Sequence, residues 1–379
     1  MEKISAFLLT FVIALSLYST NPAHASTQHN ENLTRAIKSY QGMQTFLYKP
    51  NDQLYLETYP YNGGNPYSYV WEFSQAYNAT LDMALLPKVG QNYSTDITDR
   101  VSGLMKYWNS NKQPSGFDSY VDPPYGNGGD MFYDDNEWIG LASIQHYSMT
   151  HDKSSLKRAE DIFKLIVYGW DNNPNDPAPG GVFWTQASWS HDRNTISNAT
   201  GAKLGLNLYL ITKDPYYLNW SKKMYDWVNT NMLAPNGLYW DHIDLQGNIQ
   251  QTQWSYNQGV MIGANVLLYQ STHNKEYLNR ADNLANTAIQ YYETDNRLTS
   301  QPAVFNAIFF RNLLKLSTFN HDQHYIKFIN AYATMEWNTN RDNQTNLFSF
   351  GDIETLQQAG MVQIYSLLSL KKDEYKLIP

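Results

Sequence analysis

Two adjacent aspartates, Asp134 and Asp135, are the residues of this chain best suited to acid–base chemistry. They stand in Met131–Trp138, between a glycine-rich loop at 126–130 and a stretch that predicts a helix running to about Thr150. One aspartate is enough to cap a helix and complement its dipole. A second carboxylate beside it adds repulsion that capping does not require. Both a helix cap and a catalytic pair remain open on these residues alone.

The geometry of such a pair suits cleavage of a glycosidic bond. Where a turn leads into a helix, neighbouring side chains diverge by roughly 100°, which can leave the two carboxyl groups about 5 Å apart. At that separation one carboxylate can attack the anomeric carbon while the other protonates the leaving oxygen, with retention of configuration. Repulsion raises the pKa of one group and leaves the other ionised. The pair therefore indicates a retaining glycosidase mechanism.

The elements that would position this pair form a helical repeat. Four times a helical stretch ends in a short polar turn and a second helix follows. The turns are His151-Asp152, Lys213-Asp214, His273-Asn274 and His321-Asp322. The helices carry apolar or small residues at i, i+3, i+4 and i+7, which indicates one buried stripe on each. Examples are Ala281, Leu284, Ala285, Ala288 and Ile289 in one helix, and Ala202, Gly205, Leu206 and Tyr209 in another.

Two further hairpins complete a set of six. One is expected from Tyr69 to about Asn109, and the other pairs a helix at about Leu356–Leu370 with one near Thr34–Leu47. Six hairpins predict an all-α fold, either a closed (α/α)6 toroid or an open solenoid. The unequal repeat lengths and the long aromatic loops favour the toroid, with a cleft at one end. No low-complexity linker divides the chain, so residues 26–379 are expected to form a single catalytic domain.

Several segments resemble glycoside hydrolase family 76. Tyr133-Asp134-Asp135-Asn136-x-Trp138 is similar to the catalytic motif of that family, and other similar blocks follow in the family's order. They are Gly180–Trp184, Asn194–Asn198, Gly237–Asp241, Trp254–Gly259 and, more weakly, Phe305–Arg311. The resemblance implies an (α/α)6 barrel that cleaves α-1,6-mannan internally with retention, with Asp134 as nucleophile and Asp135 as general acid/base. It implies no cofactor and no metal.

The chain departs from the family pattern at two places. Ser190-His191-Asp192 precedes the Asn194 block, which leaves the detail of the sugar subsites open. His242 stands where a small residue is more usual and would narrow the cleft.

Substrate contacts are expected from aromatic rings that stack on sugars and from polar groups that bind hydroxyls. The predicted set is Trp71, Trp138, Trp184, Asn194, Asn198, Asp241, Trp254, Tyr256, Asn257, Gln258 and Arg311. Structural roles fit several of these equally well. Trp138 could anchor its helix, Asn194 and Asn198 could cap theirs, and Arg311 in an apolar helix could belong to an ion pair.

The first 25 residues predict a cleaved secretion signal. Lys3 precedes an apolar run from Ile4 to Tyr18, and small residues at 23 and 25 fit a cut after Ala25. The alternative is a membrane anchor, but an apolar run of about 15 residues is short for a span of about 20. The mature protein is therefore expected to be secreted, extracellular and free of the membrane.

The composition limits the partners. The chain has no cysteine, which excludes disulfides and thiolate metal sites. Its net charge of −8 disfavours nucleic acid and anionic lipid. The 30 tyrosines and 11 tryptophans fit either a carbohydrate cleft or a large core. We expect a monomer that acts on a neutral, α-mannan-like polysaccharide.

Other functions stay open. Retention would let a sugar acceptor replace water, so a transglycosylase that remodels wall or capsule glycan fits the same pair. An unsaturated glycuronyl hydrolase or a sugar epimerase could share the architecture. A non-catalytic glycan-binding protein would be expected to have lost one of the two acids, and both are present.

Overall fold

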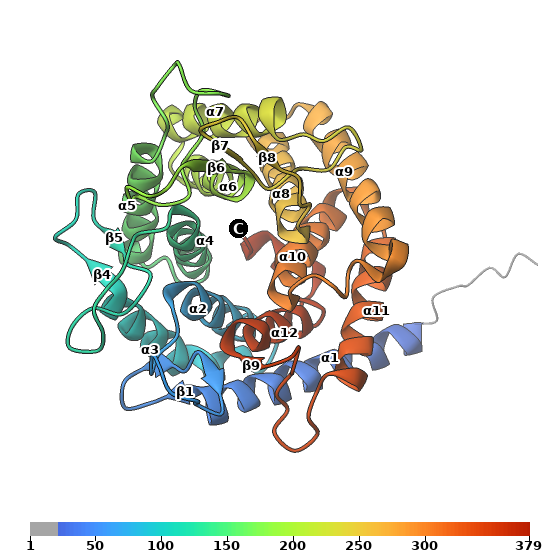
Figure 1. Ribbon diagram of the computed structural model, residues 1–379. Helices are drawn as coiled ribbons and strands as arrows, with labels where there is room; N and C mark the ends of the chain where they lie inside the picture. The colour runs from blue at the N-terminus through green and yellow to red at the C-terminus, as the bar shows by residue number, and fades with distance from the viewer. Residues whose placement is uncertain (1–21) are drawn as a thin grey trace, which may run out of the picture.

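Two concentric rings of helices form the core of the computed structural model, which describes residues 22–379 with side chains from residue 28 (Figure 1). The inner ring is α2 (Val70–Ala84), α4 (Tyr133–Thr150), α6 (Thr195–Thr212), α8 (Ser255–Thr272), α10 (Ala303–Asn320) and α12 (Thr355–Leu367). The outer ring is α1 (Pro22–Gly42), α3 (Ser94–Leu104), α5 (Lys153–Tyr168), α7 (Pro215–Asn231), α9 (Lys275–Glu293) and α11 (His324–Thr339). Residues 1–21 of the predicted signal sequence lie outside the described residues.

The inner ring is closed. Each inner helix packs on the next in chain order, and α12 packs back on α2. Each outer helix packs on an inner partner: α3 on α2, α5 on α4, α7 on α6, α9 on α8, α11 on α10, and α1 on α12. The chain is thus an all-α (α/α)6 toroid, as predicted, and the open solenoid is excluded.

Four hairpin turns repeat the same local chemistry. The inner helix ends on a residue in the left-handed conformation, with φ between 58° and 63°, whose N–H bonds a carbonyl four residues earlier. These residues are His151, Lys213, His273 and His321. In three of the turns the next residue caps the outer helix through its side-chain oxygen; these are Asp152, Asp214 and Asn274. Short turns of this kind force the two helices to run antiparallel.

The two rings differ in how they are buried. The outer helix α9 is amphipathic and buries its predicted stripe from Ala281 to Ile289. The inner helix α6 is buried on nearly every face, because it packs against both neighbours and α7. Close approach requires glycine at Gly259, where a Cβ atom would lie 2.6 Å from the Cα of Phe309 in α10.

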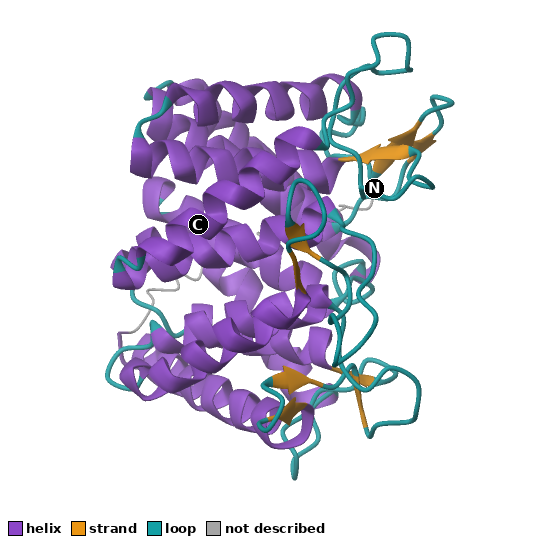
Figure 2. Ribbon diagram, turned by 90° about the vertical axis from the view of Figure 1, so that its left-hand side faces the viewer, coloured by secondary structure: helices purple, strands orange, loops and turns teal. Residues whose placement is uncertain are grey.

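The strands and long loops gather at one end of the barrel (Figure 2). They form small antiparallel ladders: β1 (Tyr48–Lys49) with β2 (Leu54–Tyr55), β3 (Thr58–Tyr59) with β9 (Ile353–Glu354), and β4 (Trp108–Asn109) with β5 (Gly116–Phe117). A three-stranded sheet joins β6 (Asp192–Asn194), β7 (His242–Asp244) and β8 (Ile249–Gln250). Since the short turns lie at the other end, all six inner helices begin at the looped end.

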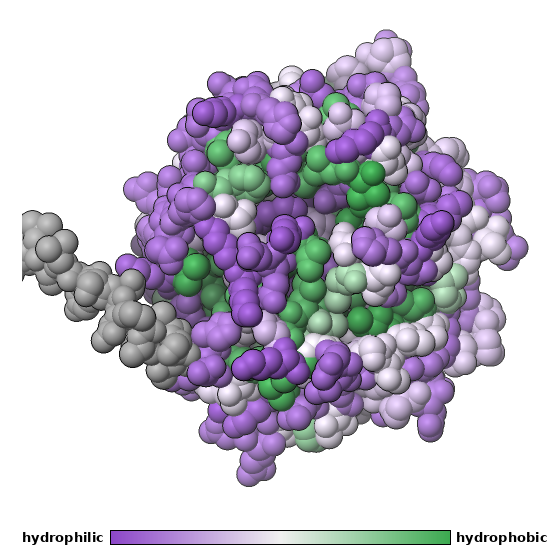
Figure 3. All heavy atoms as spheres, turned by 180° about the vertical axis from the view of Figure 1, so that it is seen from behind, coloured by the Kyte–Doolittle hydropathy of each residue, from purple (hydrophilic) through white to green (hydrophobic). Residues whose placement is uncertain are grey.

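The chain's last residues lie at the centre of the ring (Figure 1). The Lys315 ammonium in α10 donates a hydrogen bond to the Ile378 carbonyl at 2.8 Å. Figure 3 shows the end opposite the loops, where hydrophilic residues dominate the rim and hydrophobic residues show between them. Within the part of the chain that the structure describes, no helix has the length and apolar character needed to cross a membrane.

Candidate active site

The aspartate pair lies in the first turn of α4, and neither side chain caps the helix. The capping position is Phe132, whose backbone is extended and whose side chain makes no capping bond. The backbone N–H of Tyr133 donates to the Trp184 carbonyl at 2.8 Å, which fixes the start of α4 against the following loop. The two carboxylates are therefore surplus to helix capping, and they are only partly exposed at the floor of a cleft.

The cleft has a volume of about 860 Å³ and opens at the looped end of the barrel. It is lined from the first turns of α2, α4, α8 and α10 and from the loops between the hairpins. Its walls are formed by Asn65, Tyr69, Trp71, Glu72, Ser119, Tyr120, Asn127, Gly128, Gly129, Asp130, Phe132, Asp134, Asp135, Trp138, Trp184, Asp192, Asn194, Asp241, His242, Tyr256 and Phe305. Because helix N-termini point at this space, their dipoles favour negative charge there.

The two aspartates differ in their surroundings. One Asp134 oxygen accepts from the backbone N–H of Asp135 at 3.0 Å, and the other accepts from the Trp184 indole N–H at 3.2 Å. Burial raises the pKa of Asp134 to about 7, although these bonds oppose the rise. Burial, and then the charges of Asp134 and Glu72, raise the pKa of Asp135 well above its usual range. The charge of Asp134 therefore favours the protonated form of Asp135, while the two hydrogen bonds to Asp134 favour its ionised form.

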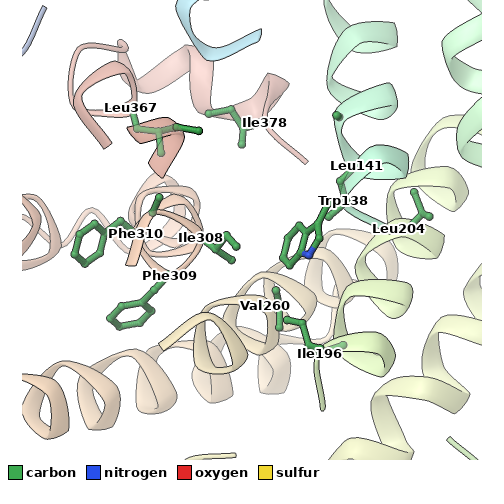
Figure 4. Close-up of a cluster of buried hydrophobic side chains, with 14 of the residues drawn as sticks. Trp138, Leu141, Ile196, Leu204, Val260, Ile308, Phe309, Phe310, Leu367 and Ile378 are labelled. Carbon is green, nitrogen blue, oxygen red and sulfur yellow. The ribbon is translucent and has the colours of Figure 1, made fainter. Parts of the chain in front are cut away.

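Six of the predicted substrate residues line the cleft beside this pair: Trp71, Trp138, Trp184, Asn194, Asp241 and Tyr256. The rings of Trp71 and Trp138 lie 5.5 Å apart, and the Trp138 indole points from α4 into the interior of the ring (Figure 4). Trp138 is only 5% exposed, whereas Trp184 is 36% exposed. Trp138 therefore both anchors its helix and closes the cleft, whereas the ring of Trp184 is partly exposed in the cleft wall.

Two lining residues also have structural partners. The Asn194 side chain caps α6 by accepting from the Ser197 N–H at 3.4 Å, so it is both a cap and a cleft residue. Tyr256 stacks face to face on Phe305, with ring centroids 3.9 Å apart and planes 5° apart. The Phe305 ring therefore covers one face of the Tyr256 ring.

Three predicted substrate residues in the helix-opening segments do not line the cleft. Asn198 is fully buried, and its amide bonds both the N–H and the carbonyl of Val182. Gln258 is also buried and bonds the N–H and carbonyl of Tyr239. Asn257 is fully buried in α8. The prediction is corrected for these residues, because the first turn of an inner helix also faces its own loop and neighbouring helices.

Trp254 and Arg311 also lie away from the cleft lining. The Trp254 ring packs edge-on against Phe305, 5.5 Å between centroids. Arg311 is buried and forms an ion pair with Asp82 of α2, and it also donates to Gln363 at 3.0 Å. The sequence allowed Arg311 either to contact the substrate or to form an ion pair, and the structure shows the ion pair.

The cleft also contains acidic and aromatic residues that are not among the predicted substrate contacts, notably Glu72, Asp130 and Phe305. Asp192 and His242, which depart from the family pattern, line it as well. The signal for Glu72 was weak, because an acid in the first turn of a helix is also expected from the helix dipole alone.

His242 forms a second polar centre in the wall. Its Nδ1 lies 3.0 Å from an Asp241 oxygen, and the side chain is about one third exposed. The hydrogen bond to Asp241, helped by the charge of Asp192, raises the pKa of His242. The cleft lining holds six carboxylates and no lysine or arginine, so His242 is the one basic side chain among these residues. Across residues 22–379, no three acidic or histidine side chains are grouped as metal ligands would be.

The fold and the site define a class: an (α/α)6 barrel with two adjacent carboxylates and aromatic walls in a cleft at one end. Residues 31–371 match the glycosyl hydrolase family 76, and the chain belongs to this family.

Among curated proteins, the chain is 27% identical over 177 residues to mannan endo-1,6-alpha-mannosidase DCW1 of Saccharomyces cerevisiae, covering 42% of this chain and 39% of that protein. It is also 27% identical over 154 residues to the protein of that name in Candida glabrata, covering 37% of this chain and 34% of that one. The matches thus span well under half the length of these relatives.

Solved structures share the fold. The glycoside hydrolase family 76 mannosidase Bt3792 of Bacteroides thetaiotaomicron superposes with a TM-score of 0.80 at 23% identity, over 89% of this chain and 98% of that one. The α-1,6-mannanase GH76A of Salegentibacter, described as an inactive variant with two consecutive aspartates changed to asparagine and bound to α-1,6-mannotriose, gives a TM-score of 0.70. Its identity is 19%, over 89% of this chain and 99% of that one.

Proposed function

We propose that this protein is a retaining glycoside hydrolase that cleaves α-1,6-linked mannan outside the cell, after removal of residues 1–25. The observation that carries the proposal is the adjacent pair on the cleft floor, where Asp134 accepts two hydrogen bonds that favour its ionised form and its charge favours the protonated form of Asp135. The substrate rests on the names of relatives that act on 1,6-linked α-mannan. Six acids and no lysine or arginine in the lining also fit a neutral polysaccharide better than an anionic one.

In the first step Asp134 acts as nucleophile. A carboxylate oxygen of Asp134 bonds the anomeric carbon, the glycosidic C–O bond breaks, and Asp135 donates its proton to the leaving oxygen. The Trp184 N–H and the Asp135 backbone N–H orient the Asp134 carboxylate. In the second step Asp135 takes a proton from water, whose oxygen attacks the anomeric carbon and displaces Asp134, restoring both groups.

Digestion of soluble α-1,6-mannan by wild type, Asp134→Asn and Asp135→Asn tests this function, with β-linked mannan and an α-glucan in parallel. We expect both substitutions to abolish turnover, and NMR of the first product to show the α-anomer. Asp130→Asn is the matched control, because Asp130 lines the same cleft but bonds Trp189 instead of the pair. Turnover that survives both substitutions would refute the mechanism. Activity on another glycan only would refute the substrate and keep the mechanism.

A further inference from the structure

Glu72 is a buried acid that the proposed mechanism does not yet use. It lies in the first turn of α2, is 8% exposed, and lines the cleft together with Asp135. Its Oε2 atom is buried and has no hydrogen-bond partner among the described residues. A buried carboxyl oxygen without a partner is destabilising, so such a residue is unexpected in a purely structural position.

Packing holds Glu72 beside the catalytic pair. The ring of its neighbour Trp71 lies 5.5 Å from the ring of Trp138, which is one helical turn beyond Asp135 in α4. This contact sets the first turns of α2 and α4 side by side, and both carboxyl groups open into one cleft.

The charges around these two groups are almost all negative. Glu57 and Glu354, from the loop before β3 and from β9, act on Glu72. Asp134 acts on Asp135 from the same helix, and the Tyr256 hydroxyl from α8 also faces the pair. No lysine or arginine lines the cleft, and the one basic side chain of the lining, His242, is hydrogen-bonded to Asp241.

We propose that Glu72 is a positioning residue for catalysis, whose negative charge holds the acid/base proton on Asp135. This inference rests on the role of Asp135 proposed above. Burial raises the pKa of Glu72 to about 8, with the charge of Glu57 as the next cause, and burial also raises the pKa of Asp135 well above its usual range. Glu72 therefore gains its negative charge as the pH rises through about 8. The charge that appears on Glu72 then opposes loss of the Asp135 proton, which extends the working range of the acid to higher pH.

Glu72→Gln tests this role, because it removes the charge and keeps the shape. In the pH profile of kcat/KM on soluble α-1,6-mannan, we expect the alkaline limb to move down by about one pH unit. The acid limb, which reports ionisation of Asp134, should stay in place, since Glu72 is not among the groups that shift Asp134. Glu354→Gln is the matched control: Glu354 acts on Glu72 but not on Asp135, and it lies outside the cleft lining. Its alkaline limb should match that of wild type.

A second measurement needs no substrate. Carbon-13 NMR of protein labelled at the aspartate carboxyl carbons, with Asp135→Asn to assign the signal, gives the titration midpoint of Asp135 directly. We expect this midpoint to fall in Glu72→Gln and to stay in Glu354→Gln. An unchanged midpoint, or a higher KM or lower kcat with both limbs in place, would overturn the proposal and leave Glu72 as a substrate ligand or a structural residue. A lower midpoint in a protein that does not cleave mannan would uphold it while the proposed substrate fails.

Discussion

Trp184→Phe isolates one hydrogen bond to the proposed nucleophile. The wild-type indole N–H lies 3.2 Å from an Asp134 oxygen, and the indole ring packs edge-on against Phe132, 4.9 Å between centroids. Phenylalanine keeps an aromatic ring in contact with Phe132 and removes the donor. Since this bond stabilises the ionised form of Asp134, its loss must raise the pKa of that carboxyl.

The size of the effect follows from the bond and its exposure. A hydrogen bond to a charged group contributes about 1.5–3 kcal/mol. Trp184 is 36% exposed, so the low end of that range applies. About 1.4 kcal/mol corresponds to one pKa unit, and the pKa of Asp134 should rise by about one unit from its value of about 7. Because the nucleophile must be ionised, kcat/KM at pH values below the pKa of Asp134 should fall about tenfold.

The assay is the pH profile of kcat/KM on soluble α-1,6-mannan, in which the acid limb should move up by about one unit. Trp189→Phe is the control, because the Trp189 N–H donates to Asp130 at 2.9 Å and not to the pair. A change in KM alone, with the acid limb of Trp184→Phe unmoved, would refute the reasoning and leave Trp184 as a sugar platform only. An equal shift in the Trp189 variant would attribute the effect to the loop that carries both rings.

Three further changes test the wall, the core and the ring packing. Asp241→Asn should lower the pKa of His242, because the hydrogen bond that the His242 imidazole donates to Asp241 is the main cause of its raised value. Histidine NMR titration, assigned with His242→Gln, would measure the change. Arg311→Met should lower the free energy of unfolding by about 3–5 kcal/mol in urea, since it leaves Asp82 buried without its partner. Adding Asp82→Asn should recover part of that loss, and equal stability of the single and double variants would contradict the ion-pair argument. Gly259→Ala should lower the melting temperature, because overpacking against the α10 backbone costs about 1–3 kcal/mol and exceeds a helix-propensity gain of about 1 kcal/mol. A stabilised Gly259→Ala would show that α8 and α10 separate freely.

The helices and their order could be read from the sequence because their signals are local. Four hairpin turns end the inner helix on a left-handed residue, and in three of them, as at His151 and Asp152, the next residue caps the outer helix. The helix predicted to open at the aspartate motif and to run to about Thr150 agrees with α4, which spans Tyr133–Thr150. Likewise the stripe from Ala281 to Ile289 depends only on helical spacing, and it is buried as expected.

Which face a polar side chain occupies could not be read in the same way. Inner helices such as α6 and α8 are buried on nearly all sides, so periodicity does not separate a cleft face from a packing face. Asn194 and Asn198 are one turn apart and have similar surroundings in the sequence. The first lines the cleft, and the second bonds the backbone of Val182. The contacts that separate these roles come from loops distant in the chain.

By itself the sequence determined an all-α repeat of six hairpins and placed the two aspartates at the start of a helix, because capping, spacing and adjacency act over a few residues. Only the tertiary structure decided that the ring closes from α12 onto α2. It also decided that Glu72, Asp135, Asp192 and His242 share one cleft. The raised pKa values of the two aspartates depend on burial and on charges brought together from separate hairpins. The electrostatic effect of charges that are distant in the chain leaves no pattern in a local stretch of sequence.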